Sequence, residues 1–190
     1  MLPVAAIMFM LLPSISPAYT YEIHSGYTAG LILKNDESLW MTGGGVGLLD
    51  LNDYSLAKIY GTTMLIEGSG GIWDLIQGGY SHLDFLGGEI HQLSMASYAT
   101  ATLKGGRIDR LRTHQGAGYP YIDLYCLDWN HNDLTNLLTG HWSDGSAFSI
   151  QLLDVAGTVK NIDNINFIII PEPVTMLLLG LGGLLIRRKI

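Results

Sequence analysis

The sequence predicts an all-β protein: a short parallel β-solenoid closed at its C-terminal end by an antiparallel β cap. Three observations predict this fold. Residues of one type recur every 18 positions, glycine pairs separate the recurrences, and alternating apolar runs stand between them. Such repetition is typical of coils that stack like residues on like. About 150 of the 190 residues lie between two unusual ends, which is the size of one ordinary domain.

The repeat is clearest in three segments: SGGIWDL at 69–75, GGEIHQL at 87–93 and GGRIDRL at 105–111. Their isoleucines recur at one constant interval, and their leucines recur at the same interval. These positions are Ile72, Ile90 and Ile108, and Leu75, Leu93 and Leu111. Two alternating runs, 81–85 and 99–103, predict strands with one buried face.

A looser fourth copy, SLWMTGGGVGLL at 38–49, places Val46 and Leu49 in the isoleucine and leucine positions. The step from Val46 to Ile72 is longer than the step from Ile72 to Ile90. Extra residues therefore interrupt the register, and we expect them around 56–61.

The glycine pairs also permit a second architecture. Gly87 with Gly88, and Gly105 with Gly106, fit the two-residue turns of an antiparallel meander. Hairpins do not account for one residue type recurring at a constant interval, whereas stacked coils do. The glycine run at 43–47 lacks the following Lys-Ser or Lys-Thr of a phosphate loop, so we interpret it as a corner of a coil.

The segment that follows the repeats differs in character and predicts the cap. An alternating aromatic strand is expected at 119–129, a turn at Asp144 and Gly145, and further strands at 147–155 and 161–170. The coils then occupy 19–118 and the cap 119–170. No proline-rich linker separates them, so both belong to one domain.

The first eighteen residues are interpreted as a signal peptide. The apolar stretch 2–12 is followed by small residues, and Ser16 with Ala18 fits the small-x-small pattern for cleavage after Ala18. The stretch lacks a preceding Lys or Arg. The alternative is a buried N-terminal strand or helix.

The C-terminal segment 171–190 has three parts. Pro171, Glu172 and Pro173 come first, then an uncharged apolar run at 174–186, and the basic cluster Arg187, Arg188 and Lys189 follows. The run is shorter than the roughly 20 residues of an ordinary spanning helix. The basic residues snorkel and extend it, and they stay in the cytoplasm by the positive-inside rule. We predict a transmembrane helix that begins near Pro173; the alternative is a buried core helix.

These three parts, in this order, resemble a PEP-CTERM sorting signal. The resemblance covers about a tenth of the chain. It implies export in a Gram-negative bacterium and processing near Pro-Glu-Pro by an exosortase, a membrane-embedded enzyme. It also implies a transient stay in the inner membrane, release to the cell surface or the extracellular space, and an association with exopolysaccharide.

Composition is consistent with export and opposes nucleic-acid binding. The net charge is −7; removing the tail takes away one acid and three bases, which leaves 16 acids against 7 bases and a net charge of −9. Nucleic-acid binding needs basic patches. The single cysteine, Cys126, has no partner for an internal disulfide within the chain.

We find no motif for a cofactor, and the six histidines lack metal-ligand spacing. The one metal candidate is DWNHND, in which Asp128, Asn130 and Asn132 have the spacing of the first calcium ligands. Asp133 then occupies the place of the essential glycine. The alternative is a polar turn.

Two functions follow from these observations. The first is a non-catalytic cell-surface or extracellular-matrix protein that contacts polysaccharide through aromatic side chains. The tryptophans concerned are Trp40, Trp73, Trp129 and Trp142. The alternative is a small β-helical polysaccharide lyase or hydrolase, for which Asp84 and Asp109 would have to share one outer face. Because no acidic residues converge in the sequence, we favour the non-catalytic protein.

Overall fold

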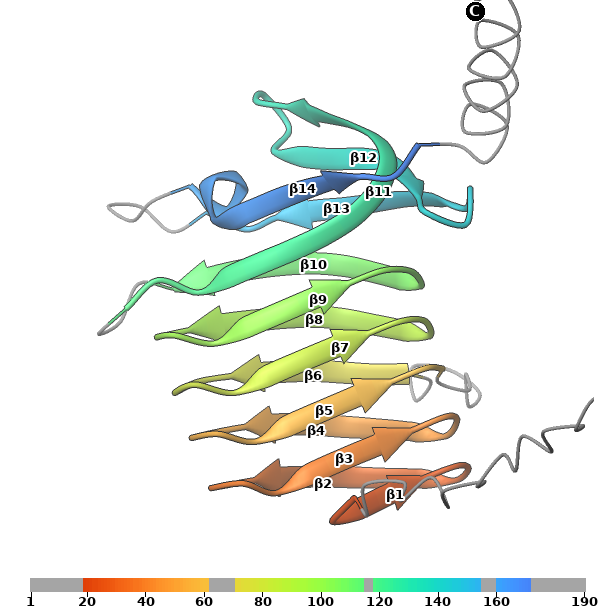
Figure 1. The fold of residues 1–190 in the computed structure, drawn as a ribbon, viewed down its shortest axis with the longest axis vertical. Helices are drawn as coiled ribbons and strands as arrows, with labels where there is room; N and C mark the ends of the chain where they lie inside the picture. Colours follow the sequence, from red (N-terminus) through yellow and green to blue (C-terminus); the bar gives the residue numbers. More distant parts are fainter. Residues whose placement is uncertain (1–18, 62–70, 115–117, 155–159, 172–190) are drawn as a thin grey trace, which may run out of the picture.

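The computed structural model describes residues 19–61, 71–114, 118–154 and 160–171. This part of the chain is all-β, with an open sheet of mostly parallel strands, one 3-10 helix and no α-helix (Figure 1). The predicted signal peptide at 1–18 and the apolar run at 174–186 lie outside the described residues. The strands are β1 Tyr21–Ile23, β2 Tyr27–Leu33, β3 Ser38–Met41, β4 Gly45–Leu51, β5 Leu56–Ile59, β6 Gly71–Gln77, β7 His82–Phe85, β8 Glu89–Ala96, β9 Thr100–Leu103, β10 Arg107–His114, β11 Tyr121–Asn132, β12 Leu137–Trp142, β13 Ala147–Leu152 and β14 Ile165–Ile169.

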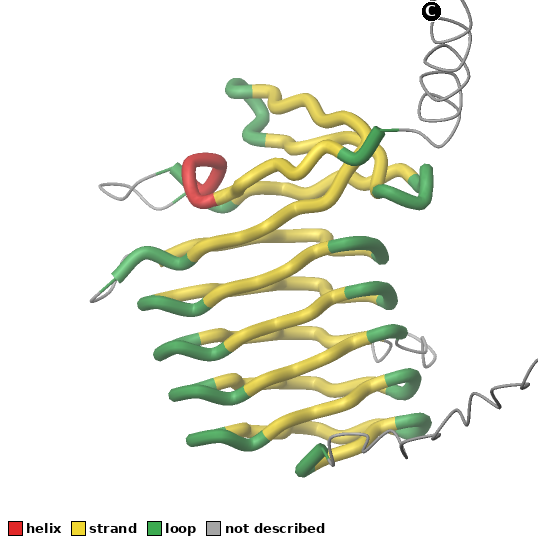
Figure 2. The backbone as a smooth tube through the Cα atoms, in the orientation of Figure 1, coloured by secondary structure: helices red, strands yellow, loops and turns green. Residues whose placement is uncertain are grey.

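The sheet folds into two facing layers (Figures 1 and 2). The front layer holds β1, β3, β5, β7, β9, β11 and β14, and the back layer holds β2, β4, β6, β8, β10 and β13. We call one front strand with the back strand that follows it a coil. From β1 to β9, each strand pairs in parallel with the strand two further along the chain. The glycine pairs therefore turn corners between the layers, and the antiparallel meander is wrong.

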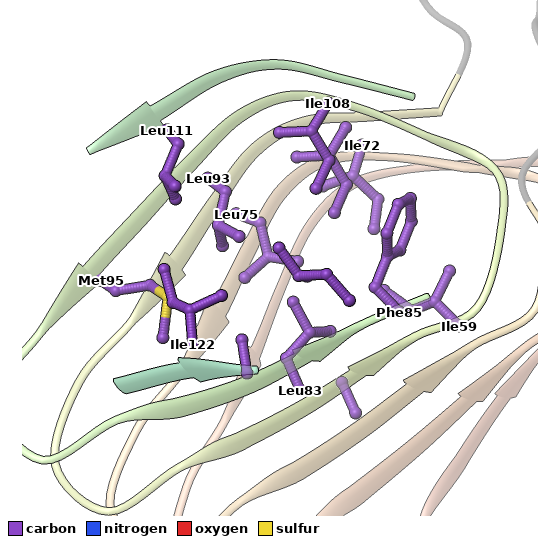
Figure 3. Packing of buried hydrophobic residues seen from close by; sticks show 14 of the residues in the cluster. Ile59, Ile72, Leu75, Leu83, Phe85, Leu93, Met95, Ile108, Leu111 and Ile122 are labelled. Atoms are coloured by element: carbon purple, nitrogen blue, oxygen red, sulfur yellow. The ribbon is translucent and has the colours of Figure 1, made fainter. Parts of the chain in front are cut away.

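The register places the repeated residues directly above one another. Ile72 pairs with Ile90 and Ile90 with Ile108, and the three leucines pair in the same way. Val46 and Leu49 join the same two columns, as predicted. Figure 3 shows members of both columns in the core between the layers, facing Leu83 and Phe85 of the front layer; the labelled members are Ile72, Ile108, Leu75, Leu93 and Leu111. Stacking like on like buries one continuous apolar core.

The extra residues in the repeat lie later than expected. Leu56–Ile59 forms the regular strand β5, which pairs with Ser38–Met41 and with His82–Phe85. Its alternate residues Ala57 and Ile59 are fully buried, as in the other front strands. The additional residues therefore fall between Ile59 and Gly71, not at 56–61.

The back strands from β2 to β10 bend where two consecutive residues face outward. The parallel register pairs Ile72 with Ile90 and Asp74 with Gln92 but leaves out Trp73 and His91 between them. The same omission recurs in the strands on either side. A local irregularity of this kind re-aims side chains. It explains why the inward isoleucine and leucine are three positions apart rather than two.

One corner requires glycine for a physical reason. Gly106 has φ +82°, and a Cβ there would lie 2.6 Å from the carbonyl oxygen of Gly88, one coil earlier. At the opposite corner a left-handed position recurs once per coil: these positions are Asn35, Asp53, Gly79 and Ser97. Short polar residues and glycine tolerate this conformation best.

The C-terminal strands close the core by crossing from one layer to the other. β11 begins in the front layer, paired in parallel with β9 through Tyr121 and Leu124. Its second half pairs antiparallel with β12, and β12 pairs antiparallel with β13. β13 then returns to the back layer, parallel to β10. The turn at Asp144 and Gly145 was predicted, whereas β12 was not.

The predicted strand at 161–170 begins later than expected. Asn161–Asn164 forms a 3-10 helix, and only Ile165–Ile169 is a strand, β14, parallel to β11. The buried Asn161 Oδ1 accepts hydrogen bonds from the Thr113 amide and hydroxyl, and Asn164 Nδ2 donates to that hydroxyl. These bonds hold the asparagines inward, which alternation alone does not indicate.

Candidate functional site

The outer surface of the back layer carries a ladder of stacked side chains from successive coils. We call Trp73, His91, Asp109 and Arg107 the outer ladder. The rings of Trp73 and His91 stack with centroids 4.1 Å apart and planes 19° apart. His91 Nδ1 lies 2.9 Å from Asp109 Oδ2, and Arg107 Nε donates to Asp109 Oδ1 at 2.8 Å. All but Arg107 occupy the outward positions that the bend in each back strand creates.

Asp109 is the electrostatic centre of this ladder. Partial burial acts to raise its pKa, but the hydrogen bonds from His91 and Arg107 outweigh burial and hold the pKa below its ordinary value. Arg107 also lies 4.0 Å from Glu89. The carboxylate is therefore charged at neutral pH and satisfied on both oxygens, while Trp73 remains 47% exposed beside it.

Two adjoining depressions lie where the back layer meets the cap. Their volumes are about 370 and 300 Å³. The smaller is lined by 106–108 and 147–149, and the larger by 128–130, 139–141, Ala147 and Phe148. β13 pairs with β10 only at Arg110 and Leu111. The first halves of these two strands therefore diverge, and the hollow opens between them.

The larger depression contains a histidine–carboxylate contact that the sequence did not indicate. His141 Nδ1 lies 2.9 and 3.0 Å from the two carboxylate oxygens of Asp128, and the His141 amide donates to the same carboxylate. The two residues are neighbours on β11 and β12. Arg107 lines the smaller depression, so the hollow connects this pair with the outer ladder.

The calcium candidates have other contacts in the structure. Asp128 bonds His141, and Asn132 Oδ1 accepts the amide hydrogens of Leu134 and Thr135. Asn130 lines the larger depression. All three lie within the strand β11. The described ranges contain no cluster of three His, Cys, Asp or Glu suited to a metal.

The acidic pair considered for hydrolysis does not come together. Asp84 lies on β7 in the front layer, whereas Asp109 lies on β10 in the back layer. They therefore belong to opposite layers, and the shared outer face that the enzyme alternative requires is not formed by this pair. The reason is that successive strands alternate between the layers.

The four tryptophans have different surroundings. Trp142 is fully buried against Phe148, and its Nε1 donates to the Gly106 carbonyl at 2.8 Å. Trp40 is partly buried among Tyr19, His24 and Tyr60. Trp129 stacks on Phe167 but keeps an exposed part, as does Trp73. Trp73 and Trp129 are therefore the tryptophans most open to a ligand.

A second exposed ladder lies at the corner where each back strand leads into the next front strand. Tyr54, Tyr80 and Tyr98 stack with centroids 5.3 and 5.0 Å apart and nearly parallel planes. Sequence reasoning missed it, although the signal was present. The tyrosines are spaced along the chain like Val46, Ile72 and Ile90, with one long step followed by one step of the regular repeat.

The cysteine lies beside the start of the tail, where β11 pairs with β14. Cys126 is fully buried, and burial raises the pKa of its thiol. The Ile170 amide donates to the Cys126 carbonyl at 2.9 Å. Pro171 is the last described residue; Glu172, Pro173 and the basic cluster Arg187, Arg188 and Lys189 lie beyond it. None of the described helical residues forms a span that is long and apolar enough for a bilayer.

Fold and surface together define the class: an all-β domain with an open, mostly parallel sheet and ladders of exposed side chains along its coils. Comparison with protein-family models, with curated proteins and with solved structures found no match for this chain. Function therefore has to be argued from the residues.

Proposed function

We propose that the chain is an exported, non-catalytic protein of the cell surface or extracellular matrix, sorted by its PEP-CTERM tail. In this proposal the described region is a short parallel β-solenoid with a cap, displayed after the signal peptide is cut behind Ala18. The observation that carries it is the ordered tail sequence: Pro171 to Pro173, an apolar run, and a basic cluster. The protein would pass through the inner membrane before its release.

The junction between domain and tail supports this proposal. In the described part of the chain, the last backbone amide that is hydrogen-bonded to another strand is that of Ile170, one residue before Pro171. Proline has no amide hydrogen and disfavours helical geometry in the residue before it. The motif thus begins where the paired domain stops, and an extended segment there suits the cleft of a processing exosortase. Glu172 would supply the one charge that the enzyme recognises.

Contact with exopolysaccharide is the second part of the proposal. The outer ladder places an exposed indole next to charged and hydrogen-bonding side chains, and the two depressions extend this surface toward the cap. Ligand sites commonly combine aromatic surface with a few placed polar groups. We do not propose the lyase or hydrolase, because Asp84 and Asp109 lie on opposite layers.

The sorting proposal is tested by the intact mass of the protein recovered from the outer fraction of its host. We expect loss of the first eighteen residues and of the segment after Pro-Glu-Pro. Replacing Arg187, Arg188 and Lys189 by acids should misplace the tail and leave it uncut, by the positive-inside rule. The double substitution Arg187→Lys and Arg188→Lys, which keeps three positive charges, is the control and should be processed normally. A wild-type mass that keeps the tail would refute the proposal.

Polysaccharide contact is tested with purified protein and the host's own exopolysaccharide. Trp73→Ala should weaken retention on immobilised polymer at least fivefold. Tyr80→Ala is the matched control, since Tyr80 is 55% exposed but lies in the tyrosine ladder, away from the outer ladder. Equal retention of all three proteins would argue against the outer ladder as the contact surface.

A further inference from the structure

The two ends of the back layer are unlike. At the C-terminal end, β13 pairs with β12, which pairs with β11, so the layer turns over into the cap. At the N-terminal end, β2 has β4 as its one partner in the described part of the chain. A stack of repeats ordinarily needs a cap at each end, because its last coil would otherwise expose the core and unpaired backbone groups.

The proposed processing leaves this end without a cover. Cleavage behind Ala18 makes Tyr19 the first residue, and β1 begins at Tyr21. The Thr20 amide is already bound to the Ser38 hydroxyl of the next front strand. Two residues are too few to reach across to β2 and form a further strand. This step rests on the proposed function.

β2 lacks the charged residues and the proline that ordinarily prevent an edge strand from pairing. Its sequence, YTAGLIL, contains no charge and no proline, and four consecutive residues at its start are exposed. Ile32 is 51% exposed. Natural edge strands are usually protected by Lys, Pro or a bulge; of these, β2 has only the bend that it shares with β4, where the register leaves out Ala29. β1, by contrast, is three residues long and carries Glu22, so β2 is the edge suited to pairing.

We propose that β2 pairs antiparallel with β2 of a second copy, which gives a closed, end-to-end dimer. A twofold axis brings the same strand from both copies together, and an uncharged strand meets no like charge when it pairs with itself. The dimer does not grow into a fibre, because the other end of the back layer is closed by β12. Two N-terminal ends then cap each other, and Pro171, where each tail begins, follows β14 at the cap end of each copy.

The test makes the same substitution, isoleucine to lysine, in each of two edge strands and compares the results. β14 is also uncharged and pairs only with β11 among the described strands, and its Ile169 is 52% exposed, close to the value for Ile32. We expect the processed protein to have twice the chain mass by light scattering. Ile32→Lys should give the monomer mass, or a dimer dissociation constant at least tenfold higher. Ile169→Lys should leave the dimer intact.

Folding of the Ile32→Lys protein is expected to be normal. Ile32 lies beside Asp50 on β4, so the new cation gains an opposite charge across the strands. Circular dichroism checks this. Hydrogen exchange of the unsubstituted protein gives an independent measure: β2 amides should exchange at least tenfold faster when the dimer is diluted to monomer.

The outcomes separate the dimer from the sorting proposal. A processed chain that is monomeric, or a dimer broken by Ile169→Lys but not by Ile32→Lys, overturns the β2 contact and leaves export unaffected. A chain that keeps residues 1–18 overturns the signal peptide. If that longer chain is still a dimer sensitive to Ile32→Lys, the β2 contact is retained; if it is monomeric, both proposals fail.

Discussion

The coils and the cap bury their cores by different means. In the coils each buried position repeats, so that Leu49, Leu75, Leu93 and Leu111 form one column. In the cap no position repeats: Trp142 packs on Phe148, and Trp129 stacks on Phe167. A repeated residue can be buried by its own copies, but the final coil has no further copy above it. Closing the stack therefore requires large side chains that occur once.

The cap also contacts the coils through their backbone. Trp142 Nε1 donates to the carbonyl of Gly106, at the corner that begins the back strand of the last coil. Asn161 accepts from Thr113 at the other end of that strand. Both ends of β10 are thus held by a unique side chain, whereas inner coils are held by their neighbours on both sides.

The largest effect is expected from Trp142→Ala. It removes the biggest buried side chain, its contact with Phe148 and its bond to Gly106, and should lower the free energy of unfolding by about 4 kcal/mol. Urea unfolding measures the loss. Hydrogen exchange should rise in β12 and β13 before it rises in β6. Equal loss of protection throughout would mean that cap and coils unfold as one unit.

Leu93→Ala tests how the coils, rather than the cap, depend on a buried side chain. Leu93 is fully buried between Leu75 and Leu111, so its truncation leaves a cavity in a column and should cost about 3 kcal/mol. Ser94→Ala, on the outer face of the same strand, is the control and should change stability by less than about 0.5 kcal/mol. A cost for Leu93→Ala near that of the control would show that neighbouring coils collapse to fill the gap.

Asn161→Ala should have an intermediate effect. The Thr113 amide and hydroxyl lose the buried oxygen that accepts from them, which should cost about 2 kcal/mol in urea unfolding. The exposed Asn166, which bonds Asp123 at the surface, is the matched control as Asn166→Ala. If both substitutions lower the free energy of unfolding equally, the buried hydrogen bonds between Asn161 and Thr113 do not hold the 3-10 helix against β10.

The smallest effect is expected from Asp109→Asn on the outer ladder. The pKa of Asp109 is lower in the folded protein than its ordinary value of 3.8. The charged carboxylate therefore stabilises the fold fully when the pH is above 3.8, and this contribution is lost as the pH falls through the lowered pKa of the folded protein. The substitution should cost at most about 1 kcal/mol at neutral pH, since partly exposed ion pairs contribute little. The difference from the unsubstituted protein should shrink below about pH 4. A pH-independent difference would show that packing, not charge, is responsible.

Several features were read correctly from the residues. The isoleucine and leucine columns, the glycine corners, the strands at 81–85 and 99–103, and the Asp144 and Gly145 turn are present in the structure. Two features were misplaced. The interruption of the repeat falls after Ile59, and Asn161 starts a 3-10 helix rather than a strand. A shift in register is visible in the sequence, but its place depends on which strands pair.

The sequence by itself determined that side chains of one kind stack at a constant interval, because burial in parallel coils favours like residues in register. It also determined the motif on which the sorting proposal rests. Only the tertiary structure decided which surfaces exist. Trp73, His91 and Asp109 form a ladder because each back strand bends at that position, and Asp128 meets His141 because β11 crosses to the cap. Such contacts depend on how strands distant in the chain twist and diverge, which no local pattern encodes.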